Sequence, residues 1–257
     1  MSAIGFAPLD MAVLGIAAFL VGLRRGGVNG AAVLAVIILS SHFTAAASVG
    51  IGVLIFLYAD VQATVLLVRD VDWPTLGRLL VPTVIGIAVA ALIGQRLPTA
   101  VFEWVLFGII LLAYLGMILQ RAGRTRAGER AVRRALPWYV TPVAGFLSGF
   151  TSMIGNLAGV FVAIYFAATG AMKAQFIATS VWFFFALNLI KLPIHIWGWK
   201  TLTAEMFPGT LVLVPLVTLG IWLGRVIVRR MSEETYRRFV IVVAGAAVLR
   251  YLYVLVT

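Results

Sequence analysis

The sequence has no cysteine and few charged residues, and both shortages exclude whole classes of protein. Without cysteine there can be no disulfide, thiolate metal site or cysteine nucleophile. Charged residues make up 11% of the 257-residue chain and hydrophobic residues 63%, whereas a soluble domain carries about 25% charged residues. Nine acidic and twenty basic side chains cannot cover several apolar helices, so lipid must be the solvent for most of the surface.

Acidic residues are scarcer than basic ones, which gives a net charge of +11. A nucleic-acid partner is not expected, because most arginines lie in short stretches between apolar runs and not in a basic patch interleaved with aromatics. Such stretches are typical of cytoplasmic loops. The N-terminus, MSAIGFAPLD, has no basic region, and no A-x-A site follows its apolar run. It therefore predicts a first transmembrane segment that is retained, not a cleaved signal.

Apolar segments recur along the chain in two groups of five, which predicts an all-α, polytopic transmembrane helix bundle. Six segments approach the roughly 20 residues that a helix needs to cross a bilayer, whereas the first two of each group are shorter and predict broken or re-entrant helices. We expect a first repeat in residues 1–120, a linker in 121–136 and a second repeat in 137–257. The segments cover residues 8–23, 30–41, 43–59, 76–95, 100–120, 137–151, 156–170, 174–191, 207–227 and 238–256.

The linker carries six arginines and one glutamate, which is the strongest orientation signal in the chain. It predicts a cytoplasmic linker and a multi-pass protein of the cell (inner) membrane. Counting outward from it places Arg24, Arg25, Lys173 and the basic residues of 225–238 on the same side as cytoplasmic loop charges. Both termini then lie outside.

The two halves resemble each other. Phe19-Leu-Val-Gly22 followed by Asn29 aligns without a gap with Phe146-Leu-Ser-Gly149 followed by Asn156. Because five is an odd number, the halves would enter the membrane from opposite sides as inverted repeats, an arrangement common in secondary transporters. Chance similarity between glycine-rich helices is the alternative.

Each half has a glycine-rich break, at residues 22–30 and 149–159, which points to a binding site. Each break opens a new helix, whose unpaired N–H groups attract anions. We expect two such ends to face each other and bind a small anion without a full positive charge, unless the glycines and asparagines serve only packing and capping. Gly145-x-x-x-Gly149 and Gly220-x-x-x-Gly224 predict packing faces. The candidate residues are Gly27, Asn29, Ser152, Gly155 and Asn156.

Later segments add Thr179, Ser180, Asn188 and Lys191 as candidate substrate-binding residues. Asn188 and Lys191 are three residues apart and share a helix face. Lys191 lies close to the end of its segment, so snorkelling to the interface is the alternative.

Titratable groups suited to proton coupling are few. His195 lies in a Trp-rich stretch typical of a membrane interface, and neither it nor His42 is expected to couple protons. Asp60 and Glu103 lie near segment ends, so we expect no carboxylate near the middle of a span. The motifs H-E-x-x-H, G-x-S-x-G and G-x-x-x-x-G-K-[ST] are absent, so an enzyme and a metal site are not expected.

The ending Leu219-Gly-Ile-Trp-Leu-Gly-Arg, followed by Arg229-Arg230, a polar turn and a last apolar helix, resembles the sulfite exporter TauE/SafE family, also called toluene-sulfonate uptake permeases. The family's glycine clusters are degenerate here: the first keeps Gly26, Gly27 and Gly30, and the second has Asn156 and Leu157 after Gly155.

The resemblance implies a secondary transporter of sulfite, an organosulfonate or a related small anion, without a cofactor, and we expect it to be an exporter. Its partners would be the anion and membrane lipid, with a homodimer as an open option. Two other functions stay open: a permease for a small carboxylate and a non-enzymatic membrane assembly or insertion factor.

Overall fold

The predicted helical bundle is confirmed by a computed structural model, which describes residues 6–28, 31–66, 70–93, 137–156 and 158–232, and eleven positions from 234 to 253. No β-strand occurs among these residues. The helices are α1 Pro8–Arg25, α2 Ala31–His42, α3 Ala45–Leu66, α4 Trp73–Ile93, α6 Val140–Gly155, α7 Ala158–Thr169, α8 Lys173–Pro193, the π-helix η2 Ile194–Gly198, α9 Met206–Leu211 and α10 Val214–Arg229.

Helix length follows the predicted division into long and short segments. Four stretches are long and apolar enough to cross a membrane, and they coincide with predicted long segments: Ala47–Leu66, Trp73–Ile93, Lys173–Gly198 and Met206–Arg229. Large apolar side chains such as Val65, Leu92 and Trp222 are exposed on them, as lipid contact requires. The predicted segment 100–120, the linker 121–136 and most of 238–256 lie outside the described residues.

In the structure, the breaks between the helices are shorter than we expected. We expected α1 to end near Gly22 and α6 near Gly149, but α1 continues to Arg25 and α6 to Gly155. Both helices can extend because a glycine in an apolar helix is tolerated where another backbone packs against it. Conversely, the predicted segment 207–227 is divided into α9 and α10. A proline lies in the first turn of α10, where a backbone N–H would form no hydrogen bond within the helix, so its absence breaks none.

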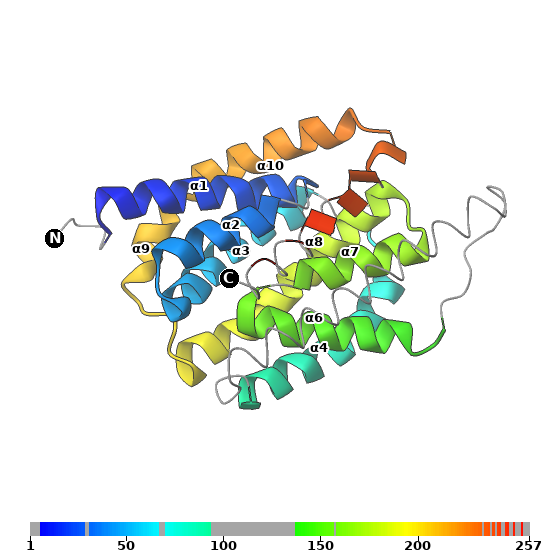
Figure 1. The fold of residues 1–257 in the computed structure, drawn as a ribbon, viewed down its shortest axis with the longest axis horizontal. Helices are drawn as coiled ribbons and strands as arrows, with labels where there is room; N and C mark the ends of the chain where they lie inside the picture. The colour runs from blue at the N-terminus through cyan, green and yellow to red at the C-terminus, as the bar shows by residue number, and fades with distance from the viewer. Residues whose placement is uncertain are drawn as a thin grey trace.

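Two flanking helix pairs enclose the central helices. Figure 1 shows α1 beside α10 along one edge and α4 beside α6 along the other, with α2, α3, α7 and α8 between them. Each pair takes one helix from each half of the chain, and α3 of the first half contacts α8 of the second. This reciprocal pairing favours the inverted repeat, which remains a prediction.

The pair α4 and α6 is joined through backbone contact. A Cβ atom added to Gly86 would lie 2.1 Å from the Phe146 carbonyl oxygen, and one added to Gly149 would lie 2.1 Å from the Thr83 carbonyl oxygen. Thr83 Oγ1 also donates a hydrogen bond to the Gly145 carbonyl oxygen at 3.0 Å. The prediction that Gly145 and Gly149 form a packing face is confirmed.

The pair α1 and α10 is also joined through backbone contact at glycines. A Cβ atom at Gly22 would lie 2.2 Å from the Val217 carbonyl oxygen, and one at Gly220 would lie 2.3 Å from the Phe19 carbonyl oxygen. At Gly224 the nearest atom, a carbonyl oxygen of α1, would be 2.5 Å away. The predicted packing face of Gly220 and Gly224 is therefore confirmed as well.

The glycine contacts predict different effects for two alanine substitutions in the same helix. Gly86→Ala should lower the free energy of unfolding by about 1–3 kcal/mol, because α4 and α6 must move apart to admit the methyl group. Gly77→Ala is the matched control, since no atom lies within 4 Å of its added Cβ. Thermal melting of detergent-solubilised protein measures both. Equal melting temperatures for the two variants would contradict the described packing.

Candidate functional site

The centre of the bundle holds a cluster of buried charges. Arg24 and Arg25 are 7% and 2% exposed, and Lys191 and Asp60 are both 0% exposed. The expectation that Arg24 and Arg25 are cytoplasmic loop charges is wrong, because α1 extends past Gly22 and carries both residues into the protein. We expected an anion site without a full positive charge, whereas this cluster carries full positive charges.

Asp60 is the acidic member of this cluster. It forms an ion pair with Arg25, and Asn188 Nδ2 donates a hydrogen bond to Asp60 Oδ2 at 2.7 Å. Asp60 was expected near the end of its segment, but it lies inside the span Ala47–Leu66. The predicted segment ended at residue 59, whereas the helix runs to Leu66. One carboxylate thereby connects α1, α3 and α8.

Arg24 is held by aromatic contact instead of by an acid. Its Cζ lies 4.0 Å from the centroid of the Phe184 ring and 5.7 Å from that of Phe56, within the range of cation–π attraction. A Cβ atom at Gly159 would lie 2.8 Å from Arg24 Nη2, so the guanidinium lies against the first turn of α7. No ion pair to Arg24 occurs in the part of the chain that the structure describes.

The acceptors that bind Lys191 in the described part of the chain are neutral. Its Nζ donates to the Ser152 carbonyl oxygen at 3.1 Å, to Ser152 Oγ at 2.9 Å and to Asn156 Oδ1 at 2.7 Å. The alternative that Lys191 snorkels to the interface is therefore wrong. Asn156 ends α6 in the left-handed conformation, with φ 57°, which places its side chain beside α8.

Three buried cations thus share one carboxylate, which leaves an excess of two positive charges among these described groups. A buried charge is costly unless it is paired and hydrogen-bonded. Neither the aromatic contacts of Arg24 nor the neutral acceptors of Lys191 cancel a charge. The arrangement is therefore suited to an anion.

A small cavity adjoins the two arginines. Its lining includes Arg24, Arg25, Gly27 and Ser180, with the Phe184 ring beside them. It has space for about one water molecule. Arg25 Nη2 and Ser180 Oγ are buried and have no hydrogen-bond partner among the atoms described. Two polar groups of the lining are therefore free to bind a ligand.

Most of the predicted site residues lie at the cavity or in the charge cluster. Gly27, with φ 112°, and Ser180 line the cavity; Ser152, Asn156, Asn188 and Lys191 belong to the charge cluster. Gly155 is the last residue of α6, next to Asn156.

Two predicted residues fall elsewhere. Thr179 Oγ1 accepts a hydrogen bond from the Asp72 backbone N–H at 2.9 Å, so it serves the turn before α4 and not the cluster. Asn29 lies outside the described residues. Ser152 was expected in the break between two helices, but it lies within α6.

One face of α8 carries most of these groups. Ser180, Phe184, Asn188 and Lys191 are separated by four, four and three residues, and His195 follows four residues later. This face extends over about 22 Å at the usual helical rise. His195 is 0% exposed, and its Nδ1 lies 2.7 Å from Thr201 Oγ1. From the sequence only Asn188 and Lys191 were expected to share a helix face, although the same spacing extends from Ser180 to His195.

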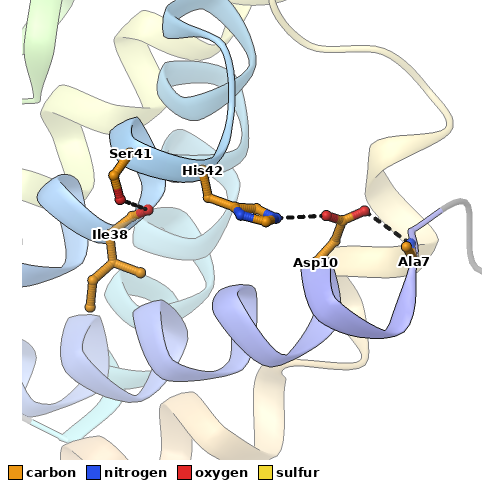
Figure 2. A network of polar contacts seen from close by, with 5 residues as sticks. All are labelled: Ala7, Asp10, Ile38, Ser41 and His42. Atoms are coloured by element: carbon orange, nitrogen blue, oxygen red, sulfur yellow. Dashed lines mark hydrogen bonds and ion pairs between the residues drawn. The ribbon is translucent and has the colours of Figure 1, made fainter.

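His42 lies away from the cavity. Its Nε2 lies 2.8 Å from Asp10 Oδ1, and Figure 2 shows this contact at the start of α1, where the Ala7 backbone N–H also donates to Asp10. Asp10 precedes Arg24 by fourteen residues, or about 21 Å of helix. The contact ties the end of α2 to the start of α1.

Most of the chain matches one known protein family. A scan against protein-family models matched residues 14–251 to the family described as Sulfite exporter TauE/SafE. Searches of curated proteins and of solved structures found no match.

The buried ion pair predicts a strong effect on stability. Asp60→Ala should lower the free energy of unfolding by about 3–5 kcal/mol, because Arg25 would be left charged and unpaired. The double variant Arg25→Met with Asp60→Leu should recover most of this loss, since no charge is then stranded. Glu234→Ala, which removes the exposed Arg238–Glu234 pair, serves as the control and should melt like the unchanged protein. An Asp60→Ala variant with the control's melting temperature would contradict the pairing.

Proposed function

Because the chain belongs to the sulfite exporter TauE/SafE family, we propose that it exports sulfite or a related sulfur-containing anion, and that Arg24, Arg25 and Ser180 bind this anion. The observation that carries the proposal is the excess positive charge beside a cavity in which Arg25 Nη2 and Ser180 Oγ have no hydrogen-bond partner among the described atoms. The family indicates the kind of cargo, and the cluster supplies a place for it.

The chemistry of the cavity suits an oxyanion. Arg25 Nη2 and Ser180 Oγ are hydrogen-bond donors without acceptors, and hydrogen bonds from a cation to an anionic oxygen are about twice as strong as neutral ones. The first turn of α7, against Arg24, adds the partial positive charge of a helix N-terminus. The Phe184 ring excludes water from one side of the guanidinium groups.

Transport requires the cavity to change. A space for about one water is too small for sulfite, so the helices around it must part on each side of the membrane in turn. The polar face of α8, from Ser180 to His195, offers a route through the apolar interior. An inside-negative potential favours outward movement of an anion by about 2.3 kcal/mol per charge per 100 mV, so export needs no second ion.

Flux measurements in proteoliposomes test the proposal. Under an imposed potential, vesicles with the protein should release sulfite faster than empty vesicles, and Arg24→Gln should reduce this flux at least about tenfold by removing a charge-assisted contact. Arg230→Gln, at an exposed position after α10, is the matched control and should transport normally.

Each unexpected result has a definite meaning. Transport of a small carboxylate but of no sulfur anion would make the protein a carboxylate permease. Absence of flux for either class would favour an assembly factor and end the proposal.

Asn156 provides a second test through Lys191. Asn156→Gly preserves the left-handed backbone conformation but removes the side-chain acceptor of Lys191 Nζ, so folded protein with reduced flux is expected. Asn156→Leu should also strain the backbone and lower the yield. Normal sulfite flux in the glycine variant would remove Asn156 and its contact with Lys191 from the transport site.

A further inference from the structure

Among the described residues, the lining of the cavity holds no negatively charged group that could pair with a cation. The residues that line it include two arginines and no carboxylate. Among the described residues, Asp60 is the one carboxylate in the charge cluster, and its two oxygens are taken by Arg25 and Asn188. The acceptors around Lys191, on Ser152 and Asn156, are occupied by its ammonium group.

A ligand that carries its own ammonium group would therefore meet two guanidinium groups and no carboxylate among the described lining residues, and the Phe184 ring is already in contact with both arginines. Its positive charge would lie near Arg24 and Arg25 in an apolar setting that includes Phe184 and Val181, where like charges repel without screening by water. The anionic end of such a zwitterion could still accept hydrogen bonds, but its ammonium group would lose its hydration and gain no partner.

From this geometry we infer that the site selects its ligand by charge: it rejects sulfonates that carry an ammonium group, and it prefers dianions to monoanions, with Arg24 as the residue that sets this preference. The inference rests on the proposed function and specifies which sulfur anions the proposed site takes.

Arg24 has this role because its charge is the one beside the cavity that no acid cancels. Arg25 also lines the cavity, but it already shares its charge with Asp60. A monoanion would offset one of the two excess charges, and a second negative group on the same ligand would offset the other. Removing the charge of Arg24 should therefore remove the advantage of the second negative group, while a monoanion still has Arg25 Nη2 and Ser180 Oγ as donors.

Three two-carbon sulfonates form a matched set of probes. Sulfoacetate ends in a carboxylate, 2-hydroxyethanesulfonate in a hydroxyl and 2-aminoethanesulfonate in an ammonium group, and they are otherwise similar in size. Each is added at increasing concentration to proteoliposomes that transport labelled sulfite, and the concentration for half-inhibition is measured. Sulfoacetate should compete best, the hydroxyl compound next, and the ammonium compound should be weaker than the hydroxyl compound by about 100-fold or more.

Charge variants of Arg24 complete the test. Arg24→Gln should bring sulfoacetate and 2-hydroxyethanesulfonate to similar half-inhibition concentrations, whereas Arg24→Lys should keep their order. A second readout covers the case in which Arg24→Gln leaves too little sulfite flux for an inhibition measurement. In that case the shift in melting temperature that each probe causes in detergent ranks the probes for each variant separately. Arg230→Gln should rank the probes as the unchanged protein does.

The outcomes separate this inference from the function on which it rests. Sulfite flux with equal inhibition by the ammonium and hydroxyl compounds would overturn the charge selection and leave the exporter proposal standing. An unchanged preference for sulfoacetate in Arg24→Gln would overturn the role of Arg24. No sulfite flux in the unchanged protein, together with no melting shift from any probe, would overturn both.

Discussion

The ion pair between Arg25 and Asp60 is the interaction on which the centre of this protein depends. In an apolar interior, two adjacent arginines cannot both stay charged and unpaired without a large desolvation cost. Asp60 neutralises one of them and, through Asn188, fixes α8 against α1 and α3. Arg24 is then held by the Phe184 ring, which retains a charged guanidinium without cancelling its charge. The same acid that makes the cluster stable thus leaves one arginine available to a ligand.

Backbone packing places these groups. The end of α1 can lie at the cavity because Gly22 and Gly220 let α1 and α10 approach until carbonyl oxygens nearly touch α-carbons. A glycine at position 159 similarly makes room for the Arg24 guanidinium at the start of α7. In lipid, where helices gain no hydrophobic energy by association, such close contact is a principal source of helix attraction. The small residues are therefore as necessary to the site as the charged ones.

The sequence predicted the helices better than it predicted the charges. Length and hydropathy identified the described spans, and the glycine spacing correctly identified two packing faces, because both depend on local pattern. The positive-inside rule misplaced Arg24 and Arg25, since it treats an arginine after an apolar run as a loop residue and cannot see a partner 35 residues away. Asp60 was missed for the same reason: its burial is tolerable only beside Arg25, and that contact is tertiary. The breaks were expected to supply positive charge through helix ends alone, whereas the structure places the full charges of Arg24 and Arg25 beside the first break.

The pairing of helices also limits how such a protein can open. Parting the two halves of the chain would separate α1 from α10 and α4 from α6, and so break the backbone contacts at Gly22, Gly86 and their partners. A movement in which each flanking pair stays together breaks none of these contacts. It changes only the side-chain contacts to the central helices, and the cavity lies where α1 meets α8. Because side-chain contacts can rearrange more readily than interlocked backbones, the second movement disrupts less of the packing. Its cost falls on the contacts of Arg24 and Arg25 with the Phe184 ring of α8 and on the ion pair of Arg25 with Asp60 of α3, and an anion that enters beside the arginines can offset part of this cost.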